Sequence, residues 1–283
     1  MILITGSSGF IGSNFINFFL KNKMKFHGID KKKSKYLNFN NFSKINLTSK
    51  KKLEQLFKKI KPNIVIHLAA DSGLNYCHNN KENAFDNNLV STFNLLTMCN
   101  KYNCKKFFFA SSMSVENFDK SFSFYGFTKF ASENLIKSFK KNYNILGIIA
   151  RFSNIFGPFS SHKTSAIHEM IKCKLSNKKF YIHGTGNQQR DFLHVDDLII
   201  KILKIIKLKS PKDNYILSSG KKQSINNVIN TINTNSKIKM KIKKISPPAG
   251  YDVNFSSKMK LNFSKNFSQK ITKTIKWYNP KYI

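Results

Sequence analysis

Arginine and acidic residues are scarce in this chain of 283 residues. Of the 49 basic residues, only Arg151 and Arg190 are arginines. The chain has 14 acidic residues, so its formal net charge is +35. So basic a composition is typical of nucleic-acid-binding proteins. Recognition of phosphates and base edges, however, usually uses the planar guanidinium of arginine. We therefore interpret the lysines as solvated surface residues and expect no specific nucleic-acid partner.

Long apolar stretches and patterned cysteines are also missing. No run of about 20 apolar residues occurs, so we expect no membrane insertion. The first residues, MILITGSSGF, have no charged region ahead of the apolar ones, which argues against a signal peptide and for a cytoplasmic protein. Cys77, Cys99, Cys104 and Cys173 show neither paired nor metal-ligand spacing. We expect them to be reduced thiols and expect no metal site.

A glycine pattern follows the first expected strand, Met1–Thr5. Gly6, Gly9 and Gly12 form G-x-x-G-x-x-G, and an apolar-periodic helix continues through Leu20. Glycines in this strand–turn–helix context allow a tight turn and bring backbone N–H groups close to a pyrophosphate at the helix N-terminus. The pattern therefore predicts a dinucleotide site, with a ligand-free glycine turn as the alternative.

An acidic residue, Asp30, ends the second expected strand, residues 25–29. A carboxylate at this position can accept hydrogen bonds from an adenosine ribose and repels a 2′-phosphate, which favours NAD over its phosphorylated form. The lysines at 31–33 could neutralise such a phosphate, and Asp30 could also be a solvated turn residue.

Strand and helix patterns alternate through the first half of the chain with short connections. Further strands are expected at 64–67, 107–110, 145–150, near 180, and at 215–217 and 237–245. Helices are expected at 50–60, 82–103, 125–141, 164–175 and 195–206, with one more that begins at 225 and a last one that ends near 277. This order predicts an α/β fold with a Rossmann-type, doubly wound parallel sheet. We expect a dinucleotide-binding domain at 1–155 with a returning segment near 190–217. A smaller, irregular C-terminal substrate lobe would comprise 156–189 and 218–283.

A hydroxyl and a Tyr/Lys pair stand near the centre of the chain. Ser111 and Ser112 follow the Phe-rich strand, and Tyr125 and Lys129 are four residues apart at the start of a helical pattern. That spacing places both side chains on one helix face. An ammonium group near a phenol favours the phenolate, so the pair could move a proton. The alternative is a surface pair on an amphipathic helix.

Six segments, taken together, resemble the extended short-chain dehydrogenases, and in particular the NAD-dependent nucleotide-sugar epimerase/dehydratase family. They occur in the family's order and span nearly the whole chain. The segments are TGSSGFIGS at 5–13, HLAA at 67–70, ASSMSV at 110–115, YGFTK at 125–129, RFSNIFGP at 151–158 and GTGNQQRDFLHVDD at 184–197.

The resemblance implies roles for the matched positions. Tyr125 would be the catalytic acid/base, Lys129 the partner that lowers its pKa, and Ser112 a residue that hydrogen-bonds the reacting hydroxyl. Substrate contacts are implied at Ser112, Asn154 and Arg190, although Arg190 could also form an ion pair with Asp191. NAD contacts are implied at Gly6, Gly9, Phe10, Ile11, Gly12, Asp30, Asn46, Leu47, Leu68, Ala69, Ala70, Asn88, Tyr125 and Lys129.

Three departures from the family pattern bear on the reaction. Met113 and Ser114 stand where the family's dehydratases carry an acidic pair, so dehydration is disfavoured. The link from Val115 to Tyr125 is short, which leaves the sugar pocket and hence the sugar open. No arginine follows Arg190, and Pro248–Asp252 stands where the family often has an arginine that binds the diphosphate.

These observations predict an NAD-dependent nucleotide-sugar 4-epimerase acting through a transient 4-keto intermediate, most simply on a UDP-hexose for surface polysaccharide synthesis. The same residues would also serve an NAD(P)H-dependent nucleotide-sugar ketoreductase. A third reading is a nucleotide-sugar binding protein that has lost catalysis. By resemblance, we expect a homodimer that pairs the helices at 82–103 and 125–141.

Overall fold

Two compact units make up the described part of the chain in this computed structural model. It describes residues 1–117, 123–143, 145–235, 239–246 and 266–279. The first unit comprises residues 1–152 and 202–216, and the second comprises 153–201 and 217–283. Residues 190–201, expected with the first domain, group with the second unit because the strand at Gln189–His194 pairs within that unit. No described helix is long and apolar enough to cross a membrane.

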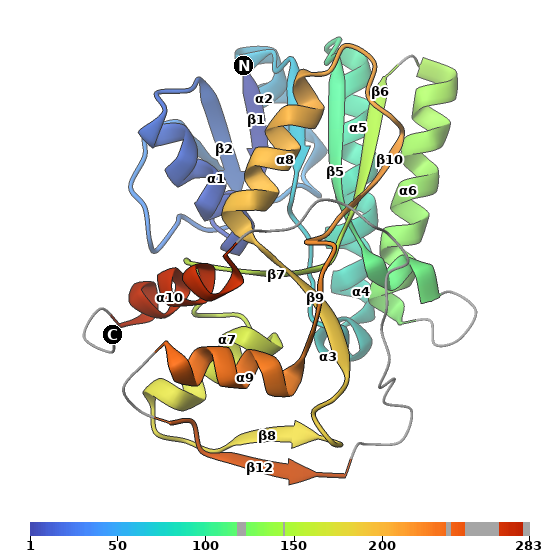
Figure 1. The fold of residues 1–283 in the computed structure, drawn as a ribbon. Coiled ribbons are helices and arrows are strands. Elements are labelled where there is room, and N and C mark those ends of the chain that lie inside the picture. Colours follow the sequence, from blue (N-terminus) through green and yellow to red (C-terminus); the bar gives the residue numbers. More distant parts are fainter. Residues whose placement is uncertain (118–122, 144, 236–238, 247–265, 280–283) are drawn as a thin grey trace. The chain divides into compact units, whose positions relative to one another are not determined.

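A seven-stranded sheet runs through the first unit in the order β10-β6-β5-β4-β1-β2-β3 (Figure 1). The pairings that join β6 to β3 are all parallel. The strands are β1 (Ile2–Thr5), β2 (Phe26–Asp30), β3 (Phe42–Lys44), β4 (Ile64–His67), β5 (Lys106–Ser112), β6 (Leu146–Phe152) and β10 (Asn214–Leu217). The carboxyl ends of parallel strands meet at one edge, which is where such sheets bind ligands.

Helices cover both faces of this sheet, which confirms the doubly wound fold. Side chains alternate between the two faces of a strand. Phe26 of β2 contacts Phe19 of α1 with ring centroids 5.6 Å apart, whereas Ile29 belongs to the core cluster that includes α2 and α5. The helices are α1 (Phe10–Lys21), α2 (Lys50–Ile60), α3 (Leu74–Asn79), α4 (Lys81–Phe85), α5 (Ser91–Lys101) and α6 (Phe124–Tyr143).

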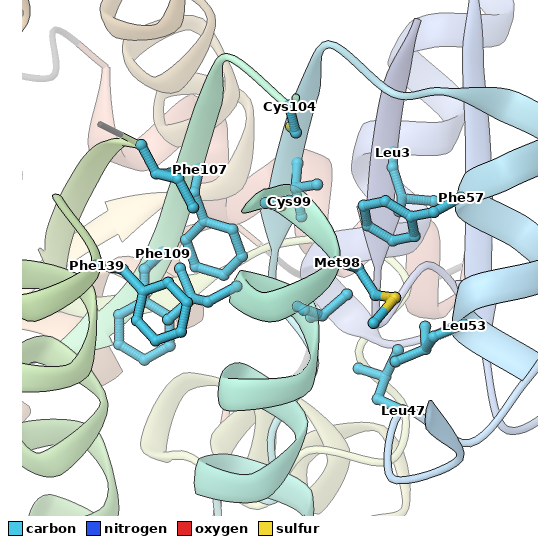
Figure 2. Close-up of a cluster of buried hydrophobic side chains, with 14 of the residues drawn as sticks. Leu3, Leu47, Leu53, Phe57, Met98, Cys99, Cys104, Phe107, Phe109 and Phe139 are labelled. Carbon is cyan, nitrogen blue, oxygen red and sulfur yellow. The ribbon is translucent and has the colours of Figure 1, made fainter. Parts of the chain in front are cut away.

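The main core lies between the sheet and helices α2, α5 and α6. Figure 2 shows Phe107 and Phe109 of β5 facing Phe139 of α6, while Leu3 of β1 lies beside Phe57 of α2. Phe107 is fully buried and Phe109 nearly so, as expected for a central parallel strand covered on both faces. This packing fixes β5, and with it the strand end that carries Ser112.

The second unit has its own core and two small sheets. A three-stranded sheet has the order β11-β9-β7, and a two-stranded one pairs β12 with β8. Its strands are β7 (Asn154–Phe156), β8 (Phe180–His183), β9 (Gln189–His194), β11 (Lys222–Ser224) and β12 (Ile242–Ile245), and its helices are α7 (Ala166–Leu175), α9 (Ile225–Thr234) and α10 (Phe267–Tyr278). Helix α8 (Val195–Lys207) begins in the second unit and ends in the first.

Several elements differ from the expectation. Ser111 and Ser112 lie inside β5 rather than after it, because they continue the ladder opposite Arg151 and Phe152. The helix expected at 82–103 contains a π-helical turn, Asp86–Val90, between α4 and α5. The short strands β3, β7 and β11 were not predicted, since three residues are too few to show a period. Strand β9, with six residues, was not predicted either. The strand expected at 237–245 is described over Ile242–Ile245.

Candidate active site

The glycine loop after β1 is so tight that a side chain cannot be accommodated at two of its positions. Gly6 has φ +67°, and a Cβ there would lie 2.8 Å from the backbone nitrogen of Ala69. A Cβ on Gly12 would lie 2.0 Å from the Gly6 carbonyl oxygen, well inside any contact distance. The loop therefore depends on glycine for its path, as the sequence predicted.

Helix α1 begins directly at this loop, at Phe10. Its N-cap is Gly9, which offers no side-chain acceptor, and the N–H of Ser13 donates to the Gly9 carbonyl at 2.8 Å. Ile11 and Gly12 precede Ser13, so their N–H groups have no carbonyl four residues back within the helix. Uncapped N–H groups at a helix N-terminus, with no Cβ in the way, attract an anion. The loop thus fits the pyrophosphate of a dinucleotide.

Asp30 ends β2 beside the glycine loop. One carboxylate oxygen accepts the N–H of Ser8 at 3.0 Å, and the other accepts the N–H of Lys32 at 3.3 Å. Burial raises the pKa of Asp30, while these N–H groups act in the opposite direction. The carboxylate is therefore held in one orientation at the carboxyl edge of the sheet. That geometry suits an acceptor for ribose hydroxyls.

Asn46 and Leu47, predicted to contact the cofactor, precede α2. Asn46 is exposed, and its side-chain oxygen accepts the N–H of Thr48 at 3.3 Å, as in an Asx turn. The Leu47 side chain is buried in the main core, and its carbonyl accepts from the Asn94 amide at 3.1 Å. A contact to the cofactor stays a prediction for both residues.

A chain of hydrogen bonds through the buried His67 joins the glycine loop's strand to the HLAA segment. Thr92 Oγ1 donates to the Asn88 carbonyl at 2.6 Å, so it accepts from His67 Nε2 at 3.0 Å. His67 Nδ1 is then unprotonated and accepts from Thr5 Oγ1 at 2.7 Å. Thr5 Oγ1 in turn accepts the N–H of Ala69 at 3.2 Å. Burial and the nearby Lys129 charge lower the pKa of His67 to about 3, which keeps the ring neutral.

Asn88, in the π-helical turn, connects the HLAA segment to α6. Its side-chain oxygen accepts the N–H of Asp71 at 2.7 Å, and its amide donates to the Asp71 carbonyl at 3.1 Å and to Thr128 Oγ1 at 3.0 Å. Thr128 Oγ1 donates to the Tyr125 carbonyl at 2.8 Å. Asn88 therefore fixes Leu68, Ala69 and Ala70, all half-buried, relative to the first turn of α6.

The neutral state of His67 predicts acid sensitivity. Because its folded pKa is far below the unfolded value of about 6.5, the unfolded chain binds more protons, and stability falls as pH drops from about 6.5 towards 3. Between about pH 7.5 and pH 5, we expect the free energy of unfolding to fall by about 2 kcal/mol less in His67→Gln than in the wild-type protein. Urea unfolding at both pH values measures this. The exposed His78→Gln is the control, and equal slopes for all three proteins would contradict the prediction.

Ser112, Tyr125 and Lys129 come together at the carboxyl end of β5. Lys129 is buried, and its Nζ donates to the Ala110 carbonyl at 2.7 Å and lies 5.9 Å from the centroid of the Tyr125 ring. Ser112 Oγ accepts from the N–H and the hydroxyl of Ser114 at 3.2 and 3.0 Å. The Ser112 proton is therefore available to donate, and it is hydrogen-bonded to Tyr125.

The surroundings of Tyr125 and Lys129 determine the protonation state of each side chain at neutral pH. Burial raises the pKa of Tyr125 to about 12, and the hydrogen bond from Ser112 partly offsets this. Burial lowers the pKa of Lys129 to about 8, while the charge of Glu133 acts to raise it. At neutral pH the resting site thus holds a phenol beside an ammonium ion. Further positive charge next to the ring would favour the phenolate, and the trio could then accept a proton from a hydroxyl.

The two remaining substrate candidates, Asn154 and Arg190, lie in the small sheet of the second unit. Asn154 of β7 donates to the Asp191 carbonyl at 3.2 Å, and Arg190 of β9 lies opposite Gln223 of β11. The Asp191 carboxylate accepts the N–H groups of Ser219 and Gly220 at 2.7 and 2.8 Å. Adjacent strand residues point to opposite faces, which argues against the alternative of an Arg190–Asp191 ion pair.

Other parts of the expected site fall outside the described residues. These are Pro248–Asp252 and most of the link between Val115 and Tyr125. No group of three or more potential metal ligands occurs in the described ranges. Sequence reasoning missed the buried chain of Thr5, His67 and Thr92, because these side chains are distant in sequence. Thr5 and His67 meet through the register of β1 and β4, and Thr92 reaches His67 from helix α5.

The comparisons with known proteins concern the family and the fold. Residues 2–218 match the family model described as "NAD dependent epimerase/dehydratase family". A dTDP-D-glucose 4,6-dehydratase of Dictyostelium discoideum is 33% identical over 70% of this chain, and the match spans 53% of that relative, about half its length. A putative UDP-glucose 4-epimerase of Methanocaldococcus jannaschii is 30% identical over 82% of this chain and 81% of its own.

Solved structures show the same fold. A UDP-N-acetylglucosamine 4-epimerase from Methanobrevibacter ruminantium M1, in complex with UDP-N-acetylmuramic acid, has a TM-score of 0.87 at 24% identity, covering 99% of this chain and 98% of its own. A UDP-glucuronic acid 4-epimerase from Bacillus cereus, in complex with UDP-glucuronic acid and NAD, has a TM-score of 0.85 at 24% identity and covers 99% of both chains.

Proposed function

This chain belongs to the NAD-dependent epimerase/dehydratase family, and we propose that it epimerises a nucleotide sugar at C4 through a transient 4-keto intermediate. NAD is the cofactor that the family description names. When bound, NAD supplies a nicotinamide ring that takes up a hydride and returns it. The glycine loop, Asp30 and the half-buried Leu68–Ala70 segment would hold it, with Tyr125 and Lys129 at its reactive end.

The proposed chemistry of the chain's own residues is proton transfer. Tyr125 accepts the proton of the C4 hydroxyl, and the Lys129 ammonium favours the phenolate form. Ser112 Oγ already accepts from Ser114, so its one proton, which is directed to Tyr125 in the free site, would be donated to the reacting oxygen once the substrate is bound. After the 4-keto sugar has rotated in the site, Tyr125 returns the proton to the C4 oxygen.

The observation that favours epimerisation over dehydration is that the two residues after Ser112, Met113 and Ser114, supply no acid and no base. Dehydration needs a further acid and base. Met113 is buried, and the hydroxyl of Ser114 holds Ser112 instead. Neighbouring carboxylates are also engaged: Glu133 is buried against Arg151, and Asp71 accepts from the Asn87 amide at 2.7 Å.

A nucleotide-sugar ketoreductase is the second candidate, because it needs the same three residues. The two reactions differ in their use of cofactor. An epimerase regenerates NAD in each turnover, whereas a reductase consumes one reduced nicotinamide for each sugar.

Asn154 and Arg190 are proposed to bind the substrate diphosphate, and the second unit is proposed as the substrate-binding lobe. A guanidinium suits bidentate recognition of a phosphate. We propose a UDP-hexose as the substrate and surface polysaccharide synthesis as the biological role.

Sugar conversion tests the proposed function. The purified protein is incubated with NAD and, separately, with UDP-, dTDP- and GDP-hexoses, and products are identified by NMR. We expect the C4 epimer with no net change in nicotinamide absorbance. Stoichiometric loss of reduced cofactor would support the reductase, and a 4-keto-6-deoxy product the dehydratase. Tight NAD binding with no product from any sugar would contradict catalysis and favour a binding protein.

We also propose a homodimer formed through α5 and α6. Phe85 of α4, Phe93 of α5 and Phe127 of α6 are each about 40% exposed, which is unusual for phenylalanine on a solvated helix. Sedimentation velocity at micromolar concentration would distinguish a dimer from a monomer.

A further inference from the structure

Three consecutive residues of β5 bind three side chains from the N-terminal half of α6. The Ala110 carbonyl accepts from Lys129 Nζ at 2.7 Å, and Ser112 is hydrogen-bonded to Tyr125. The residue between them, Ser111, donates from Oγ to the Glu133 carboxylate at 2.5 Å. Glu133 is therefore part of the same strand–helix connection as the proton-transfer pair, although it is one helical turn beyond Lys129.

Glu133 is held on both carboxylate oxygens. Oε1 accepts from Arg151 Nε at 3.0 Å as well as from Ser111, and Oε2 accepts from Arg151 Nη2 at 2.7 Å. Arg151 lies on β6 directly opposite Ser111 in the register of the parallel ladder. Glu133 is completely buried. The bidentate pairing with Arg151 and the hydrogen bond from Ser111 together compensate the burial of this carboxylate.

The charges around Lys129 are unevenly placed. Lys129 and Glu133 are four residues apart on α6 and lie on the same face. The Glu133 charge raises the pKa of Lys129, against the larger effect of burial, and Cys77 of α3 acts in the same direction less strongly than Glu133. Arg151 also approaches Glu116 of the 3₁₀ turn Met113–Asn117, with Nη1 and Oε1 3.6 Å apart, and Glu116 is not on the helix that carries Lys129. The two carboxylates share one arginine, and Glu133 is the one whose charge acts on the active-site lysine.

We propose that Glu133, fixed by Arg151 and Ser111, is a positioning residue that keeps Lys129 protonated on the Ala110 carbonyl and so sets the alkaline limit of proton transfer at Tyr125. The part concerning catalysis rests on the proposed function. The electrostatic part concerns Lys129 itself and can be measured without turnover.

The direction of the effect follows from the sign of the charge. An acid group near an ammonium raises the pH at which the ammonium loses its proton. Lys129 starts from a pKa of about 8, so it is protonated at neutral pH and loses its proton in mildly alkaline solution. Removing the Glu133 charge lowers that midpoint, and the alkaline limb of the kcat profile moves to lower pH with it.

The test compares Glu133→Gln with Glu116→Gln. Both remove one negative charge from Arg151, but only Glu133 lies one turn from Lys129. The midpoint of Lys129 is followed by NMR of isotope-labelled lysine, with the signal assigned by its loss in Lys129→Met. We expect Glu133→Gln to lower the midpoint by about one pH unit, while Glu116→Gln leaves it in place. Glu133→Asp keeps the charge, so its Lys129 midpoint should lie close to that of the wild-type protein.

Glu133→Gln leaves Arg151 partly unpaired and could fail to fold, so the double variant Glu133→Gln/Arg151→Met is measured as well. It removes both charges of the pair and is expected to show a downward shift of Lys129 that is smaller than in the single variant, because the loss of the Arg151 charge opposes the loss of the Glu133 charge. A residue that only supports packing would lower thermal stability in both variants without moving the midpoint, and that result would overturn the inference. Equal shifts in the Glu133 and Glu116 variants would overturn it too.

The outcomes for the two proposals remain distinguishable. If no sugar is converted but the Lys129 midpoint moves as expected, the proposed function fails and the role of Glu133 stands. If the sugar is epimerised and neither the midpoint nor the alkaline limb moves in Glu133→Gln, the function stands and the role of Glu133 fails.

Discussion

Tyr125→Phe is expected to lower kcat for sugar conversion by about 10³-fold and to leave NAD binding nearly unchanged. General acid–base catalysis contributes roughly 10²–10⁴-fold, and the phenol is the group that takes the proton in the proposed reaction. Phenylalanine keeps the ring and removes the hydroxyl alone. Single-turnover reduction of bound NAD by the sugar, measured by nicotinamide absorbance, reports the affected step directly.

A tyrosine elsewhere on the same helix provides the matched control. Tyr143 is at the last turn of α6, is 52% exposed, and packs on Phe139 with ring centroids 5.0 Å apart. Tyr143→Phe should keep wild-type turnover. If Tyr125→Phe turned over as fast as Tyr143→Phe, proton transfer by Tyr125 would be excluded, and any residual activity would have to come from another group.

Gly12→Ala is expected to weaken NAD binding by about 100-fold, because displacing the loop would cost one or two N–H hydrogen bonds to the pyrophosphate, each about 1.5–3 kcal/mol. The added Cβ would lie 2.0 Å from the Gly6 carbonyl oxygen and 2.7 Å from the Ser7 Cα, both backbone atoms that no side-chain rotation can move aside. The loop must therefore shift away from α1. Calorimetric titration with NAD measures the affinity, and thermal unfolding measures the accompanying loss of stability.

Gly9→Ala in the same loop is the graded comparison. Its Cβ would meet the Gly6 carbonyl oxygen at 3.3 Å, and Gly9 has φ −76°, which alanine adopts readily. We expect a clearly smaller loss of NAD affinity than for Gly12→Ala. Wild-type affinity in Gly12→Ala would show that the loop is not the pyrophosphate site, whereas equal losses in both variants would show that the clash is not the cause.

Sequence periodicity predicted the elements with strong local signals. The helix at Lys50–Ile60 and the strand at Ile64–His67 agree with the expected bounds, because apolar spacing and flanking residues lie within each segment. The glycine pattern likewise predicted a loop whose geometry requires glycine. Strand β9 escaped prediction, since its pairing partners β7 and β11 lie before and after it along the chain and the segment itself is rich in polar residues.

By itself, the sequence determined the fold class, the glycine loop and the Tyr125/Lys129 spacing, since each depends on residues that are neighbours along the chain. Only the tertiary structure decided what surrounds them. Lys129 finds the Ala110 carbonyl 19 residues away, and His67 joins Thr5 62 residues away. The Thr5–His67 pair follows from the register of β1 and β4, and the Lys129–Ala110 contact follows from the packing of α6 on β5. Register and helix packing are set by the whole sheet, so no local pattern in the sequence could specify them.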